Sequence, residues 1–336
     1  MSFSGKPIKV VSGVLLLMLA LMLVYSLKAG PVVFDTSTLF QLLQGQEIPQ
    51  AEAIKLILFE IRLPRAILAI FVGLGLGMSG AALQALVKNP LAEPGILGIS
   101  SSSALGAVAV FYFGNASNFT FALTAGGLLG ALVATGILFA VAARGFSTLT
   151  LILAGVALNA LSGAVTSLAL NLAPNPFAAY EIYFWLMGSL ANRSFDHVWL
   201  LAPFTLLGSI LLLGASRRLD AFAFGEEVAG TLGVNVRNTQ LLVVGGTALA
   251  VGAGVAVVGV VGFVGLVVPH LLRPLIGNRP SRLIPLSGLG GALLTLAADN
   301  VCRLGTSSGE LKIGVVTALL GAPFLMYLVL RGEDKQ

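Results

Sequence analysis

The sequence predicts an all-α polytopic membrane protein with about ten transmembrane helices of roughly 20 residues each. Hydrophobic residues make up 57% of the 336-residue chain, charged residues make up 10%, and the mean hydropathy is +0.98. An ordinary soluble protein is about 25% charged, so a soluble body of this size would lack the polar residues to cover its surface. The composition also excludes a disordered chain, which combines low hydrophobicity with high charge.

Ten apolar segments are long enough to be membrane helices. The boundary between the seventh and eighth is the least defined, because only Gly259 and Gly262 indicate a turn within one long apolar run. The first segment follows Lys6 and Lys9 as a signal peptide would, but no small-residue cleavage site follows it, so we expect an uncleaved helix. The predicted spans are 10–27, 64–86, 95–114, 119–142, 149–172, 196–215, 239–257, 258–275, 284–303 and 312–330.

An even number of spans places both termini on the same side of the membrane. Of the 19 Lys and Arg residues, 12 then fall on that side and 7 on the other. Basic residues are enriched in cytoplasmic loops, so this distribution predicts cytoplasmic N- and C-termini. The 41 glycines, many of them inside spans, predict close approach of the helices.

Motifs of several other protein classes are missing from the sequence. No P-loop occurs, so the chain has no motif of its own to cradle nucleotide phosphates. With two histidines and one cysteine, the sequence predicts no metal site and no cofactor, and no basic run indicates nucleic acid. One remote alternative remains: Ser79, within Gly77–Gly80, and His270 are similar to the serine and histidine of an intramembrane serine protease.

Three arginines lie at the outer ends of predicted spans, where the distribution of basic residues disfavours them. Arg62 and Arg65 open the second span, and Arg303 ends the ninth. Such arginines either extend to lipid headgroups or bind carboxylates of a docking partner. Arg303 has a further option, an i,i+4 pair with Asp299, whose charge at membrane depth requires a partner or a function.

Two inner loops carry ordered features. Asn89–Gly95 contains two prolines that interrupt the flanking helices. The serines at 100–103 follow, and they either line a path or bond back to helix carbonyls. Within the longer loop 216–238, Gly225–Val234 predicts a short helix with two glutamates at its positive end and Gly233 at its close. This helix either lies on the membrane or enters a groove of a soluble partner.

Taken together, these features resemble the FecCD-type permease family of type II ABC importers. The resemblance extends from about residue 36 to 331. It is carried by RLPRAILAIFVGLGLGMSGAALQALVKNPLAEPGILGIS at 62–100, LAGVALNA at 153–160, FWLMGSLA at 184–191, LGVNV at 232–236, GFVGLVVPHLLR at 262–273 and GVVTALLGAPFLMYL at 314–328.

The resemblance implies a type II ABC importer permease fold, with one transmembrane permease domain over 1–336 and residues 216–238 as its cytoplasmic coupling loop. In this family two permease copies in the bacterial inner membrane sit on two ATPase subunits. A periplasmic binding protein delivers an iron-siderophore, haem or cobalamin. The chain is then a transport subunit and not an enzyme. We expect a homodimer that moves an iron complex, with a siderophore favoured, from periplasm to cytoplasm.

The resemblance also implies roles for single residues, and it places the fifth and tenth spans along the path. An ATP-independent secondary transporter or channel is the alternative. Such carriers usually bury titratable groups near the midplane. Here Asp299 is the one candidate acid, and it lies toward the outer end of its span. The matching positions are Arg62, Arg65 and Arg303 for binding-protein docking, Asn89, Leu91, Ser147 and Thr148 for the cytoplasmic gate, and Gly225, Glu226, Glu227, Val228 and Leu232 for ATPase coupling.

Overall fold

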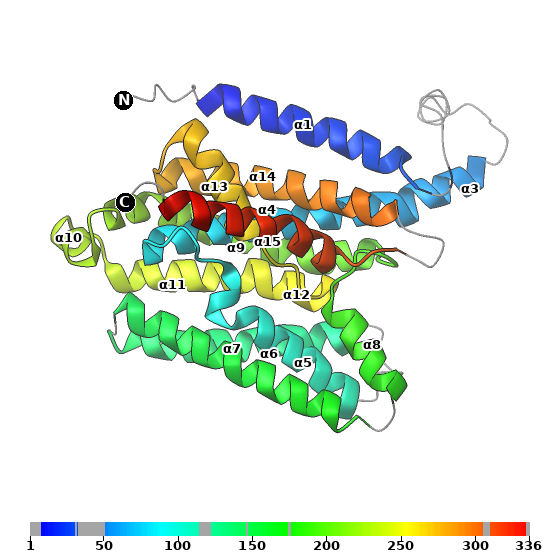
Figure 1. Cartoon of the computed structure of the whole chain (residues 1–336), viewed down its shortest axis with the longest axis horizontal. Helices are drawn as coiled ribbons and strands as arrows, with labels where there is room; N and C mark the ends of the chain where they lie inside the picture. Colours follow the sequence, from blue (N-terminus) through cyan, green and yellow to red (C-terminus); the bar gives the residue numbers. More distant parts are fainter. Residues whose placement is uncertain are drawn as a thin grey trace.

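The computed structural model describes residues 8–30, 32, 51–113, 122–145, 147–173, 176–304 and 310–333, and within these ranges every regular element is a helix. Most of the helices run along the long axis of the molecule (Figure 1). Among the described residues, seven helices are long and apolar enough to cross a membrane, and three shorter apolar helices accompany them. The predicted all-α class with about ten apolar spans is therefore confirmed.

The spans follow the predicted order along the chain. Three of them are interrupted or extended by a turn of another helix type. In chain order, the apolar spans are α1 (Ile8–Lys28); the continuous α3 (Ala51–Leu56), π-helical η1 (Ile57–Arg62) and α4 (Leu63–Val87); the 3₁₀ turn η2 (Pro94–Leu97) with α5 (Ile99–Phe113); α6 (Ala122–Ala143); α7 (Thr148–Asn171); α9 (Phe195–Phe222); the continuous α11 (Val236–Thr247), π-helical η4 (Ala248–Gly252) and α12 (Ala253–Val258); α13 (Val264–Ile276); α14 (Pro280–Arg303); and α15 (Ile313–Glu333).

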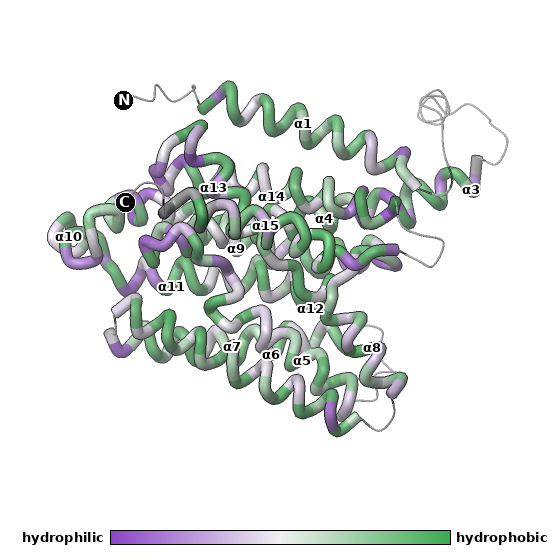
Figure 2. Tube along the Cα trace, viewed as in Figure 1, coloured by the Kyte–Doolittle hydropathy of each residue, from purple (hydrophilic) through white to green (hydrophobic). Residues whose placement is uncertain are grey.

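Two further short helices mark the two ends of the bundle. Helix α10 (Glu226–Thr231) lies at one end, and α8 (Pro176–Leu186) lies toward the other (Figure 1). The start of α1 and the end of α15 lie at the same end as α10, as an even number of crossings requires. Hydrophilic residues gather toward these two ends, and the helix middles are mostly hydrophobic (Figure 2).

Several predicted boundaries were wrong. The second span begins at Ala51 and not at 64, because α3 and η1 continue into α4. Helix α9 continues past 215 to Phe222, so the predicted loop 216–238 leaves the helix only at Ala223. Its buried stripe includes Leu219 and Phe222, which extends the helix although Arg217 and Arg218 are exposed. Helix α8 was not predicted.

The predicted turn between the seventh and eighth spans is confirmed. Helix α12 ends at Val258, and Gly259 has a φ of +85°, a left-handed value that residues with a Cβ rarely adopt. Helix α13 therefore begins at Val264 and not at 258, and it is a short helix of 13 residues.

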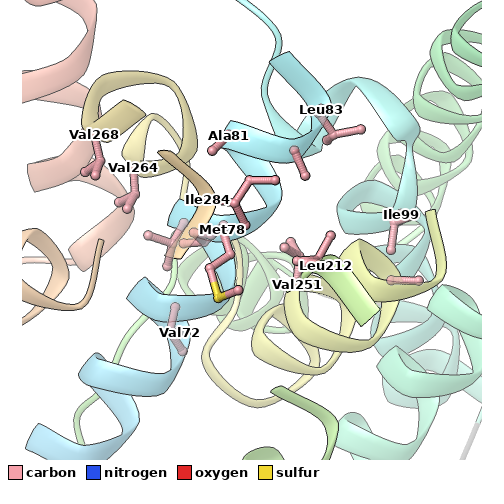
Figure 3. Packing of buried hydrophobic residues seen from close by; sticks show 14 of the residues in the cluster. Val72, Met78, Ala81, Leu83, Ile99, Leu212, Val251, Val264, Val268 and Ile284 are labelled. Carbon is pink, nitrogen blue, oxygen red and sulfur yellow. The ribbon is translucent and has the colours of Figure 1, made fainter. Parts of the chain in front are cut away.

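The centre of the molecule is the packing of α4 against α14 and α13. Figure 3 shows Met78 of α4 beside Ile284 of α14, with Val264 and Val268 of α13 nearby. Close contact of the backbones makes this possible: a Cβ at Gly77 would lie 1.9 Å from the carbonyl oxygen of Ser287. Helices in lipid have no hydrophobic driving force toward one another, so they associate through close van der Waals packing, which small residues at such crossings permit.

We therefore expect Gly77→Ala to destabilise the protein, because the added methyl group has to separate α4 from α14. Overpacking of this kind typically costs about 1–3 kcal/mol. Thermal unfolding of the purified protein in detergent measures the change. Gly136→Ala in α6 is the matched control, since a Cβ there meets nothing within 4 Å. Equal melting temperatures for the two variants would contradict the role of this packing.

Candidate functional site

A buried ion cluster lies where the start of α4 meets the end of α14, at the end of the bundle opposite α10 (Figure 1). Its centre is Asp299, whose side chain is only 1% exposed. Arg65 Nε donates to both Asp299 oxygens, at 2.9 and 3.1 Å. Arg303 Nη2 and Nε donate to Asp299 Oδ2 at 2.6 and 3.0 Å. The i,i+4 pair of Arg303 with Asp299 is thus confirmed, and Asp299 joins both arginines.

A second carboxylate completes the cluster from the segment before α15. Glu310 accepts from Arg65 Nη1 at 2.9 Å. Its side chain is 42% exposed, so this pair is in contact with water. With Arg62 included, three guanidinium groups lie near two carboxylates, and these five groups carry a net charge of +1.

The remaining arginine donors bind the end of α1. Arg62 Nη1 donates to the carbonyl oxygens of Leu27 and Lys28 at 2.8 and 2.9 Å, and its Nη2 donates to the carbonyl of Val32. Arg303 Nη1 donates to the carbonyl of Ser26 at 2.8 Å. The last carbonyls of a helix lack intrahelical partners and attract cations. Arg62 and Arg303 therefore fasten α1 to the bundle, and their buried side chains do not extend to lipid headgroups.

The turn after α4, at the α10 end of the bundle, contains the predicted gate residues Asn89 and Leu91. Lys88 ends α4 with a left-handed φ of 53°. Both gate residues are exposed, and Asn89 Oδ1 accepts from the backbone N–H of Leu91 at 2.9 Å. Burial raises the pKa of the neighbouring Glu93 carboxyl, and a hydrogen bond from the backbone of Phe263 opposes that shift. The turn is thus held by its own hydrogen bonds.

Two of the serines at the start of α5 connect helices. The hydroxyls of Ser102 and of Ser162 in α7 lie 2.9 Å apart, and Ser103 Oγ donates to the carbonyl of Gly252 at 3.2 Å. Ser101 bonds back to the carbonyl of Gly98 at 3.0 Å, as the local alternative predicted. Of the two alternatives, back-bonding therefore holds for Ser101, and the hydroxyls of the buried Ser102 and Ser103 instead hold α5 against its neighbours.

Exposed apolar side chains lie on and beside helix α10. It begins after Gly225, at a φ of +113°, and Gly233 closes it at a φ of +82°, as predicted. Ala229 faces inward and is fully buried. Phe224 just before Gly225, Val228 within α10 and Leu232 at its C-terminal cap are exposed. Phe224 was not among the predicted residues.

The structure brings a predicted gate residue and a predicted coupling residue together. The backbone N–H of Thr148, the first residue of α7, donates to Glu226 Oε2 at 3.3 Å. Between them lies Gln240 of α11, whose Nε2 donates to Thr148 Oγ1 at 3.0 Å and reaches Glu226 Oε1 at 3.5 Å. Ser147 caps α7 by accepting from the N–H of Thr150. Gln240 was not predicted. A polar side chain at the edge of an apolar span was the available signal.

The serine protease alternative fails on geometry. Ser79 Oγ is buried without a hydrogen-bond partner, and the same holds for His270 Nδ1. Within the described residues, the two side chains therefore do not form the nucleophile and base pair that this chemistry requires.

Helices α7 and α15 carry broad exposed apolar surfaces. Leu149, Leu153 and Leu161 are exposed on α7, and Leu319 and Met326 are exposed on α15. These helices are the fifth and tenth spans, to which the path was assigned. Such surfaces belong against lipid or against another membrane-embedded chain.

The fold and its two ends define a polytopic membrane protein, with a buried ion cluster at one end and an exposed short helix at the other. The chain belongs to the FecCD transport family, whose model matches residues 17–331. It is 40% identical over 280 residues to the vitamin B12 import system permease protein BtuC of Vibrio cholerae, covering 83% of this chain and 84% of that protein.

Two further comparisons agree with the family. The chain is 36% identical over 328 residues to the hemin transport system permease protein HmuU of Yersinia pestis, covering 96% of each. A solved inward-facing structure of the metal-chelate type of ABC transporter superposes with a TM-score of 0.85 at 33% identity, covering 96% of this chain and 99% of that one.

Membership of this family fixes the class of activity. The chain is a multi-pass membrane permease subunit of a bacterial ABC importer and not itself an enzyme. ABC importer permeases act with ATPase subunits and a binding protein, so an ATP-independent carrier is set aside.

Asp299→Asn is expected to destabilise the protein strongly, because two buried guanidinium groups lose their shared carboxylate. Breaking a buried ion pair in this way costs about 3–5 kcal/mol. Glu310→Gln is the matched control, since it removes a carboxylate from the same cluster at a partly exposed position. Thermal unfolding in detergent should show a much larger loss for Asp299→Asn. Equal losses would mean that the central carboxylate does not hold the cluster together.

Proposed function

We propose that this chain is one half of a homodimeric permease. The proposed permease moves a metal complex from periplasm to cytoplasm, driven by two ATPase subunits that bind its α10 end. In this orientation both termini and the coupling loop are cytoplasmic. The observation that carries the proposal is the group of exposed apolar side chains on and beside the short helix α10 at the end of the bundle, Phe224, Val228 and Leu232. An apolar helix face fits a groove on a soluble partner.

The second permease copy would pack on the apolar faces of α7 and α15. Both helices leave large side chains exposed along their length, and a path between two copies would be lined by uncharged residues, because neither 149–172 nor 313–330 contains an ionisable residue other than Tyr327. Asn89, Leu91, Ser147 and Thr148 lie at helix ends on the α10 side, where a cytoplasmic gate would have to be.

For the cargo we propose an iron complex, with a ferric siderophore favoured and haem and cobalamin as alternatives. The relatives named for vitamin B12 and for hemin are similarly close to this chain, at 40% and 36% identity. Vitamin B12 and hemin are large metal chelates, and a path lined by uncharged residues fits this chemical class. Binding of each of the three ligands to the cognate binding protein distinguishes them.

Uptake into vesicles that contain the permease is expected to require both the ATPase subunits and ATP hydrolysis, because the chain has no P-loop of its own. Uptake that persists without hydrolysis would contradict the proposal.

Leu232→Glu should reduce co-purification of the ATPase, since a charge would replace one of the exposed apolar side chains beside α10. Leu304→Glu, at an exposed apolar position at the opposite end, is the control for ATPase association.

We further propose that the arginine cluster is where the binding protein docks, with Arg65 as the residue that changes partner. Arg62 donates to carbonyls at the end of α1, and Arg303 donates to the carbonyl of Ser26 and to Asp299. Arg65 Nη1, in contrast, is held by the partly exposed Glu310. An acidic residue of the binding protein can take the place of Glu310 and form the bidentate type of pair that guanidinium groups favour. The net positive charge of the cluster favours such a partner.

Glu310→Gln should therefore tighten docking of the binding protein about tenfold, the effect of one charge-assisted hydrogen bond that no longer has to be displaced. Titration of the purified transporter with its binding protein measures the dissociation constant. Glu60→Gln removes the same charge from an exposed position on η1 at the same end, and it serves as the control for general electrostatics. An equal effect of both variants, or no effect of Glu310→Gln, would contradict the exchange.

A further inference from the structure

We propose that Gln240 and Glu226 are positioning residues that couple α10 to α7, so that the two helices move together when ATP is hydrolysed. This inference rests on the proposed function and adds a specific mechanical link to it. The link consists of Glu226 on α10, Gln240 on α11 and Thr148 at the first residue of α7. These residues are far apart in sequence and meet only in the fold.

The chemistry of the contact is a carboxylate at a helix N-terminus. The first backbone N–H groups of a helix have no intrahelical acceptor, and the helix dipole favours negative charge there. In α7, Ser147 accepts from the N–H of Thr150, and Glu226 Oε2 accepts from the N–H of Thr148. Glu226 therefore supplies part of the cap of α7 from another helix. If α10 moved alone, this N–H would lose its acceptor.

Gln240 closes the link from the side. Its side chain is 1% exposed, and its Nε2 donates at 3.0 Å to the hydroxyl oxygen of Thr148 and also faces Glu226 Oε1. A buried amide that loses its partners is costly, so this arrangement favours one relative position of the three helices. Thr148 is buried as well, so its bond to Gln240 is shielded from water, and Glu226 is half-buried.

The position of α7 makes this contact relevant to transport. One face of α7 carries the exposed leucines on which the second permease copy would pack. Helix α10 has six residues and one fully buried side chain, Ala229, and it also packs against α9 and α11. Its direct hydrogen bond to α7 is made by Glu226, so a push on α10 reaches α7 through Glu226 and the Gln240 amide.

The test uses the complete transporter in vesicles and measures the ratio of substrate imported to ATP hydrolysed. Gln240→Met, which keeps the side-chain volume but loses the amide, and Glu226→Gln, which removes the charge, should each lower this ratio about tenfold while ATPase association is retained. Gln240→Glu should lower it too, because two carboxylates then face each other. The double variant Glu226→Gln with Gln240→Glu restores one carboxylate and one amide, and it should recover most of the ratio.

Asn238→Ala is the matched control, because it removes an exposed amide from the same helix, and it should leave the ratio unchanged. Unchanged ratios in the single variants, failure of the double variant to recover, or an equal loss in Asn238→Ala would each overturn the link. A misfolded variant lowers uptake and hydrolysis together and fails to bind the ATPase. Uptake that needs no ATPase would instead refute the proposed function, so the two failures are distinguishable.

Discussion

One buried carboxylate, Asp299, organises the end of this molecule opposite α10. In a low-dielectric surrounding a lone charge is very costly, and a charge bridged by two well-placed guanidinium groups is tolerated. Arg65 of α4 and Arg303 of α14 both donate to Asp299. The buried negative charge of Asp299 is thereby neutralised, and the same bonds join the two central helices at this end. Because Arg303 also donates to a carbonyl at the end of α1, the cluster positions a third helix that is otherwise poorly buried.

Beyond this cluster, packing divides the bundle into a tight centre and a loose periphery. The tight centre is α4, α13 and α14, where glycines such as Gly77 allow near contact of backbones. The loose periphery includes α7 and α15, whose large side chains are exposed. Elements with few buried apolar contacts are the ones that move at least cost. A transporter needs this division, since a fixed frame has to hold its docking surface while other helices open and close a path.

The sequence predicted the spans well because lipid imposes a simple rule on composition and length. The boundaries were less predictable for reasons that can be named. Helix α9 extends beyond the apolar run because the buried Leu219 and Phe222 continue its stripe past two exposed arginines. For the site, the i,i+4 spacing revealed the pair of Asp299 and Arg303. The contacts of Asp299 with Arg65 and of Gln240 with Thr148 depend on which helices become neighbours, and one sequence without an alignment does not contain that information.

The arginines show why a residue's match to a family motif does not by itself define its physical role. Their positions matched docking residues, yet most of their donors are occupied inside the chain: Arg62 on carbonyl oxygens and Arg303 on Asp299 and α1. A cation that is already satisfied gains little from a new partner, because the new bond replaces an old one. In the proposed docking, the energy would come from the contact that is easiest to exchange, the half-exposed pair of Arg65 with Glu310. The internal hydrogen bonds of Arg62 and Arg303 hinder them from changing partner, and they also hold the guanidinium groups in fixed positions. A fixed cation loses little side-chain entropy on binding, so a weakly exchanging cluster can still be a specific docking surface.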